Sequence, residues 1–166
     1  DKSREAFSKA AGLMGDTEEV QLELARLAAD CGEFERAAEH YARVGSSMAQ
    51  AQYLAHQARD SFRHGDTEKG ARLVALALGA FPASPEAWLA NVVQSALAVD
   101  LPLLTKTLRE ACDNIPSDQR FLLLEGLLDV LSAARVEDGT PGLPLKREAI
   151  SELVRACVGV LAALKP

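Results

Sequence analysis

A repeat spacing of about 34 residues links apolar positions along this chain and constrains its fold more than any other feature. Leu54, Trp88 and Leu122 stand one such period apart from each other. The same interval relates several further sets of small or apolar residues: Ala58, Val92 and Gly126; Gly70 and Leu104; Val74 and Leu108; Ala77 and Ala111; Pro82 and Pro116. Such a period is typical of repeat arrays, in which each unit must stack on its neighbours to bury its apolar face.

The stretch GEFERAAEHYARV, residues 32–44, carries the same pattern one unit earlier. Ala37, Tyr41 and Val44 precede their counterparts by this period shortened by a single deletion in the intervening turn. A small residue such as Ala37 lets two helix axes approach closely, whereas a large one fills the space between helices. We therefore expect Tyr41 and Trp88 to be core residues between helices.

The period and the residue types in these columns resemble the tetratricopeptide repeat (TPR), a helix–turn–helix unit of about 34 residues. The matching residues in three successive units are Leu24, Ala25, Ala28, Gly32, Phe34, Ala37, Tyr41 and Val44; Leu54, Ala58, Gly65, Gly70, Val74, Ala77 and Pro82; and Trp88, Val92, Leu104, Leu108, Ala111 and Pro116. The resemblance implies an all-α fold, a right-handed superhelical stack of antiparallel helix pairs. We expect a single array over residues 1–166, divided into a half repeat (1–16), three full repeats (17–50, 51–84 and 85–118) and a fourth repeat with an enlarged turn and a terminal helix (119–166).

Capping residues and turn glycines set the expected helix boundaries. Thr17, Ser84 and Ser117 each precede a helical stretch and are the expected N-caps. Gly32 and Gly65 suit the left-handed conformation that ends a helix. The predicted helices span residues 2–14, 18–31, 34–45, 48–64, 67–81, 85–98, 101–114, 118–134 and 145–164.

The last unit departs from the regular period. The segment VEDGTPGLPL, residues 136–145, delays the second-helix pattern and predicts an enlarged turn. The final helix is apolar almost all round from Ala156 to Leu164, although the end of an array usually needs a polar outer face. We therefore expect this helix to fold back, to form a homodimer, or to continue into further sequence.

Composition and charge exclude several classes of protein. The net charge is −6, and no run of Lys and Arg exceeds two residues, so we expect no nucleic-acid partner. No apolar stretch is long enough to span a membrane. Cys31, Cys112 and Cys157 fit neither a zinc pattern nor a disulfide framework, and we interpret them as small, reduced core residues. This favours a reducing compartment and a cytoplasmic location, with the periplasm as the alternative.

The sequence offers little that could support catalysis. It lacks the nucleophile-elbow, phosphate-loop and zinc-protease motifs. His56, Asp60 and His64 are spaced by four on one predicted helix and so share a face, as zinc ligands can. A solvated polar stripe is the simpler interpretation, and we favour it. We expect no enzyme activity, no metal and no cofactor.

The resemblance to the TPR family implies that function lies in a concave groove lined by the first helix of each pair. Residues outside the packing columns face this groove, and they make its first half basic and its second half apolar. The clamp of Lys and Asn with which one subset of the family binds C-terminal carboxylates is absent, because Leu22 and Arg26 stand where it would begin. The predicted groove residues are Arg26, Arg59, Phe62, Arg63, Leu89, Val93, Leu123 and Leu127.

Two classes of function fit this sequence. In the first, the chain is a docking module that receives a peptide or helix of a partner protein. Its arginines would select acidic residues, and its apolar half would bind apolar ones. In the second, the chain is a structural spacer or self-association segment of a larger protein, with the apolar groove filled internally.

Overall fold

The computed structural model describes residues 17–98, 100–135 and 143–163, and these residues are almost entirely helical. The helices are α2 (Glu18–Asp30), α3 (Phe34–Arg43), α4 (Ser47–Arg63), α5 (Thr67–Ala80), α6 (Pro85–Leu97), α7 (Leu101–Asn114), α8 (Arg120–Ala133) and α9 (Arg147–Ala163), with a 3-10 turn, η1 (Ser117–Gln119), before α8. The all-α prediction is confirmed, and the helix ends differ from the predicted ones by no more than two residues. The predicted helix over 2–14 lies outside the described residues.

The segment predicted to be an enlarged turn lies between α8 and α9 in the sequence, and residues 136–142 of it are outside the described part of the chain. Two-residue parallel strands, β1 (Ala134–Arg135) and β2 (Leu143–Pro144), precede and follow those residues and pair with each other. Within the part of the chain that the structure describes, no helix has both the length and the apolar character needed to cross a membrane.

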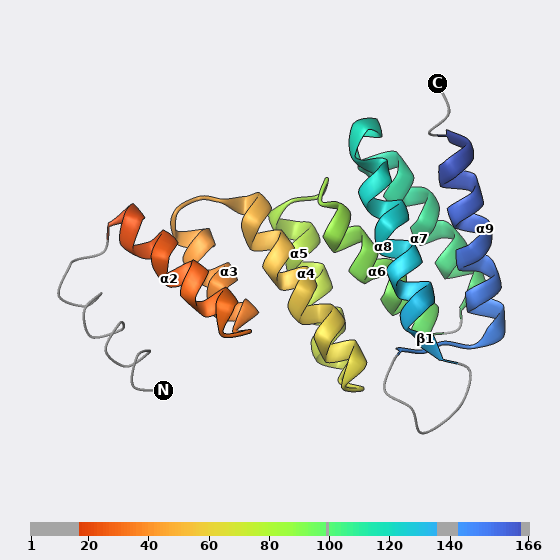
Figure 1. Ribbon diagram of the computed structural model, residues 1–166, viewed down its shortest axis with the longest axis horizontal. Coiled ribbons are helices and arrows are strands. Elements are labelled where there is room, and N and C mark those ends of the chain that lie inside the picture. Colours follow the sequence, from red (N-terminus) through yellow and green to blue (C-terminus); the bar gives the residue numbers. More distant parts are fainter. Residues whose placement is uncertain (1–16, 99, 136–142, 164–166) are drawn as a thin grey trace.

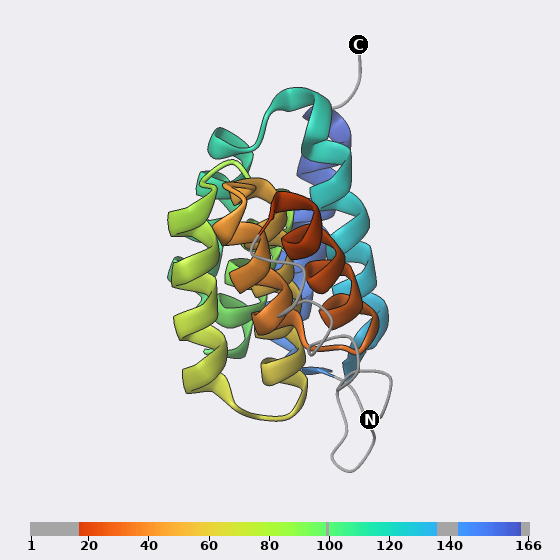
Figure 2. The same ribbon diagram turned by 90° about the vertical axis from the view of Figure 1, so that its left-hand side faces the viewer.

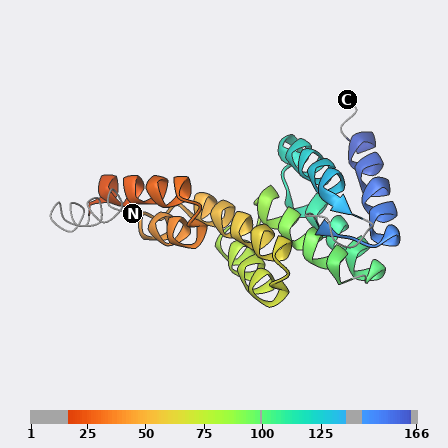
Figure 3. The same ribbon diagram turned by 60° about the horizontal axis from the view of Figure 1, so that its bottom comes forward.

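The helices pack in successive pairs along an elongated molecule (Figure 1). The pairs are α2 with α3, α4 with α5, α6 with α7, and α8 with α9. Helix α3 also packs on α4, and α5 on α6, so each of these two pairs contacts the next. The end-on view in Figure 2 shows the helices running across the long axis, and Figure 3 shows α2 and α9 towards opposite ends.

The turns between helices follow the sequence-based expectations in most cases. Gly32 and Gly65 adopt the left-handed conformation, with φ angles of 74° and 80°. Thr17 and Ser84 are N-caps, because their hydroxyls accept hydrogen bonds from the amides of Val20 and Ala87. The assignment of Ser117 as an N-cap was wrong, because this residue begins η1 and its side chain caps no helix.

The core is centred on α6, which packs against α4, α5, α7 and α8. Trp88 is buried, as predicted, and its indole Nε1 donates a hydrogen bond of 2.8 Å to the carbonyl of Pro82. Ala58 and Val92, which share one repeat column, are fully buried. The third member of that column, Gly126, lets Leu89 of α6 approach the backbone of α8, and a methyl group there would collide with the leucine.

Two core predictions were wrong, those for Tyr41 and Cys31, and Leu122 of the repeat column with Leu54 and Trp88 is also exposed. Tyr41 is only half-buried, because its ring stacks on Tyr53 of α4 at a position that solvent still reaches. Leu122 is 37% exposed, because α8 turns the neighbouring Leu123 into the core. Cys31 is exposed, since it caps the C-terminus of α2 at the surface.

Candidate functional site

The predicted apolar groove is closed in the structure. The side chains expected to line it are between 0% and 4% exposed: Phe62, Leu89, Val93, Leu123 and Leu127. The prediction that they line an open groove was therefore wrong. The physical reason is close helix packing, since Gly126 admits Leu89 and Gly70 admits the ring of Phe62. These residues stabilise the array from within and are inaccessible to a partner.

The three predicted arginines have different environments. Arg26 is exposed and forms an ion pair of 2.6 Å with Glu23 on its own helix. Arg59 is half-buried, and its Nη2 lies 2.8 Å from Nδ1 of His56. Arg63 is exposed and stands four residues after Arg59 on α4, so the two side chains leave the same face of this helix. The structure thus brings Arg59 and Arg63 together, while Arg26 is engaged elsewhere.

An aromatic cluster joins α3 to α4. Tyr41 and Tyr53 stack with ring centroids 5.2 Å apart and an angle of 6° between their planes. Phe34 lies 6.3 Å from Tyr53 and 5.8 Å from His56, again measured between centroids. All four side chains are half-buried, so the cluster presents ring surface to solvent. Offset aromatic pairs of this kind are favourable beyond the area that they bury.

His56 connects the aromatic cluster to the arginines, because it contacts Phe34 and Tyr53 on one side and Arg59 on the other. Together these side chains form one surface. We call it the aromatic–arginine surface, and its members are Phe34, Tyr41, Tyr53, His56, Arg59 and Arg63.

The electrostatics of this surface favour a neutral histidine beside positively charged arginines. Burial and the charge of Arg59 both lower the pKa of His56. Burial, followed by the charge of Arg63, lowers the pKa of Arg59, while Glu86 of α6 acts in the opposite direction. The Nε atom of Arg59 is buried and has no hydrogen-bond partner among the described residues. Burial and the neighbouring Tyr41 raise the pKa of Tyr53, which therefore keeps its phenolic proton near neutral pH.

Sequence reasoning found the arginines of this surface and missed its aromatic part. Phe34 and Tyr41 were assigned to packing columns, and Tyr53 was not singled out. A spacing of seven residues places Phe34 and Tyr41 on one face of α3, which is the signal that could have found them. Their stacking on Tyr53 depends on how α3 packs on α4, which no spacing within one helix reports.

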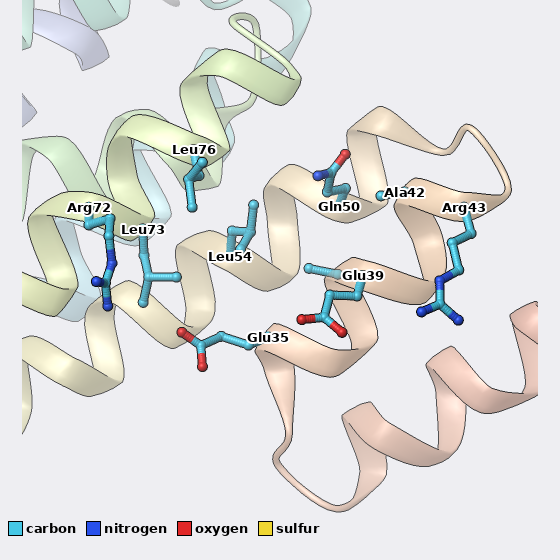
Figure 4. A pocket seen from close by; sticks show the side chains of 10 residues that line it. Glu35, Glu39, Ala42, Arg43, Gln50, Leu54, Arg72, Leu73 and Leu76 are labelled. Carbon is cyan, nitrogen blue, oxygen red and sulfur yellow. The ribbon is translucent and has the colours of Figure 1, made fainter. Parts of the chain in front are cut away.

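A second feature is an open groove between α3 and α5, across the surface of α4 (Figure 4). Its volume is about 560 Å³, which is within the usual range for ligand sites. Apolar side chains and the stems of charged ones line it. The lining residues are Glu35, Ala38, Glu39, Ala42, Arg43, Gln50, Leu54, Arg72, Leu73 and Leu76.

The three residues considered as zinc ligands form separate contacts. His56 faces Arg59, whereas Nδ1 of His64 lies 2.9 Å from the carbonyl oxygen of Asp60 and 3.6 Å from its carboxylate. Among the described residues, no group of three His, Cys, Asp or Glu side chains is arranged to hold a metal ion.

Comparisons with protein-family models, curated proteins and solved structures found no match.

Proposed function

We propose that this chain is a non-enzymatic protein-interaction module that binds an acidic segment of a partner protein on the aromatic–arginine surface. The observation that carries the proposal is the continuity of the stacked rings with Arg59 through His56, with Arg63 one helical turn further along α4. Tyr and Arg are enriched among the residues that dominate binding energy at protein interfaces. Guanidinium groups bind carboxylates with two parallel hydrogen bonds.

The proposal includes a TPR-like architecture, and the packing of the helices supports it. Glu35 and Lys69 lie in the first turns of α3 and α5, the second helices of two successive units, and their side chains form an ion pair of 3.1 Å. Corresponding helices of successive units are therefore neighbours, as expected for stacked repeats. The first helices of successive units are neighbours too, since α4 packs on α6 and α6 packs on α8. A right-handed superhelix is part of this proposal.

The ligand differs from the one expected for an open apolar groove. Since Leu89, Val93, Leu123 and Leu127 are buried, the apolar residues of the ligand would meet the rings of Phe34, Tyr41 and Tyr53 instead. The expected motif has aromatic or other apolar residues next to two or more Asp or Glu residues. Affinity should fall as salt is added, because screening weakens exposed charge pairs.

The test is a selection of peptides on the immobilised chain, followed by affinity measurements. Peptides from a display library should be enriched in acidic residues beside aromatic ones. Fluorescence anisotropy with a recovered peptide should show at least about a tenfold weaker affinity for Arg63→Glu and for Tyr53→Ala, which corresponds to about 1.4 kcal/mol. Arg109→Glu, a charge reversal on the exposed face of α7, is the matched control and should bind normally. Recovery of peptides without acidic residues, bound equally by all variants, would contradict the proposal.

A second candidate function is self-association, and exposed apolar residues of the last pair favour it. Val154 and Val158 of α9 are 48% and 62% exposed, and Phe121 and Leu128 of α8 are also exposed. The buried apolar positions of α6 and α8 agree with the internally filled groove that this function requires. Sedimentation-equilibrium experiments should then show a dimer that Val158→Lys converts to a monomer. A monomer at all concentrations would exclude this candidate.

A further inference from the structure

The groove between α3 and α5 carries charged side chains on both walls. The α3 wall carries Glu35, Glu39 and, at its far end, Arg43, while the α5 wall carries Arg72 and Lys69 stands beside it. At one end the walls neutralise each other through the 3.1 Å ion pair between Glu35 and Lys69. One helical turn further along, Glu39 and Arg72 occupy the next positions on the two walls. Neither has an ion-pair partner within 4 Å among the described residues, although both line the groove.

The floor of the groove is apolar. Leu54 of α4 and Leu73 of α5 form it, and both are almost fully buried under the groove surface. Leu76, one turn after Leu73, stands on the α5 wall and is 54% exposed. Figure 4 shows Leu54, Leu73 and Leu76 between the carboxylates of α3 and the guanidinium of Arg72. Leu76 therefore extends the apolar floor towards solvent.

We propose that this groove binds a second, amphipathic α-helix of a partner protein, independently of the aromatic–arginine surface. The two sites share no residue. The apolar stripe of the helix would cover Leu54, Leu73 and Leu76. Its edge towards α3 would carry Lys or Arg opposite Glu39, and its edge towards α5 would carry Asp or Glu opposite Arg72.

A helix fits the groove better than an extended strand does. The backbone N–H and C=O groups of α3 and α5 are already paired within those helices and cannot extend a sheet. A helix satisfies its own backbone groups in this position and presents a continuous apolar stripe to the floor. The lining residues from Glu35 to Arg43 span about 12 Å of helix, or roughly two turns, which gives room for apolar residues at positions i, i+3 or i+4, and i+7.

Glu39 and Arg72 determine which edge charges the ligand needs. Glu39→Lys makes both walls positively charged while the apolar floor stays unchanged. Glu39 is exposed, so this variant should fold like the wild type. The matched control is Glu125→Lys, the same charge change at an exposed position of α8.

The test uses a display library of short helical peptides, each about four turns long. Every member carries a fixed stripe of Leu, and the positions along its two edges vary between Lys and Glu. Peptides enriched on the wild-type chain and on the control should carry Lys on one edge and Glu on the other. Those enriched on Glu39→Lys should carry Glu on both edges, whichever direction the helix takes. A peptide selected on the wild type should bind Glu39→Lys at least about tenfold more weakly, or about 1.4 kcal/mol.

A third variant tests the apolar floor. Leu76→Asp changes an exposed residue, so the chain should keep its helical circular dichroism while losing the selected peptides. The proposal is overturned if edge charges are the same on the wild type and on Glu39→Lys, or if Leu76→Asp retains the peptides. Because Arg63→Glu and Tyr53→Ala leave this groove intact, they should bind the selected helix normally. Failure of helix binding in the groove is thus distinguishable from failure of peptide binding on the aromatic–arginine surface.

Discussion

The first two helix pairs and the last two use the same repeat spacing in different ways. In α2 to α5, polar and aromatic side chains remain at the surface, and α3 and α5 are separated enough to leave a groove. In α6 to α9, the corresponding first helices carry Leu and Val, and these side chains are buried between α6 and α8. A shared period therefore fixes the order of the helices, while the residues between the packing columns decide whether a surface stays open.

The largest expected difference in stability is between variants of Trp88 and Tyr41, the two aromatic residues predicted to be core. Trp88→Ala should lower the free energy of unfolding by about 3–5 kcal/mol, because the indole is buried and hydrogen-bonded. Tyr41→Ala should cost only about 1–2 kcal/mol, because the ring is half-exposed and has one main stacking partner. Urea denaturation of both variants measures the difference. Equal losses would show that the two halves are packed alike.

Glycine substitutions sharpen the comparison at the closest helix contacts. Gly70→Ala and Gly126→Ala should each destabilise the chain by about 1–3 kcal/mol, because the added methyl would collide with Phe62 or Leu89. The matched controls are Gly79→Ala in α5 and Gly159→Ala in α9, where the space is open. These two substitutions should raise the free energy of unfolding by about 0.5–1 kcal/mol, because alanine is the better helix former. Thermal denaturation should give a lower midpoint temperature for the first two variants and a higher one for the two controls.

The helix caps should show a smaller difference of the same kind. Ser84 begins α6 at a buried position and accepts a hydrogen bond of 3.2 Å from the amide of Ala87. Its replacement by Ala should cost about 1–2 kcal/mol. Thr17 begins α2 at an exposed position, and its cap bond is longer at 3.4 Å, so Thr17→Ala should cost about 0.5 kcal/mol. If chemical denaturation showed a larger loss of stability for Thr17→Ala than for Ser84→Ala, the expected difference between the two halves of the molecule would be contradicted.

The smallest expected effect concerns the ion pair that closes one end of the groove. A double-mutant cycle with Glu35→Ala and Lys69→Ala should give a coupling energy of about 0.2–1 kcal/mol, because both side chains are partly exposed and screened by solvent. The coupling should decrease in concentrated salt. The same cycle with Glu39 and Arg72 should give a coupling near zero, since no ion pair joins them. Equal coupling in both cycles would show that the groove closes along its length in solution.

The sequence alone determined the helical class, the helix ends and the order of the units. These follow from local chemistry, since Gly32 and Gly65 adopt left-handed turns and Ser84 caps a helix wherever the rest of the chain lies. The sequence also identified Arg59 and Arg63 as neighbours on one helix face, because their spacing of four residues is local.

Only the tertiary structure decided which surfaces stay open. Periodicity marks Leu89, Val93, Leu123 and Leu127 as one apolar face, but it cannot report whether a neighbouring helix covers that face. The separation between helices depends on side-chain size on both partners, such as Leu89 against Gly126. The contact of Tyr53 with Tyr41 and the groove between α3 and α5 arise in the same way, from residues of different helices brought together by packing.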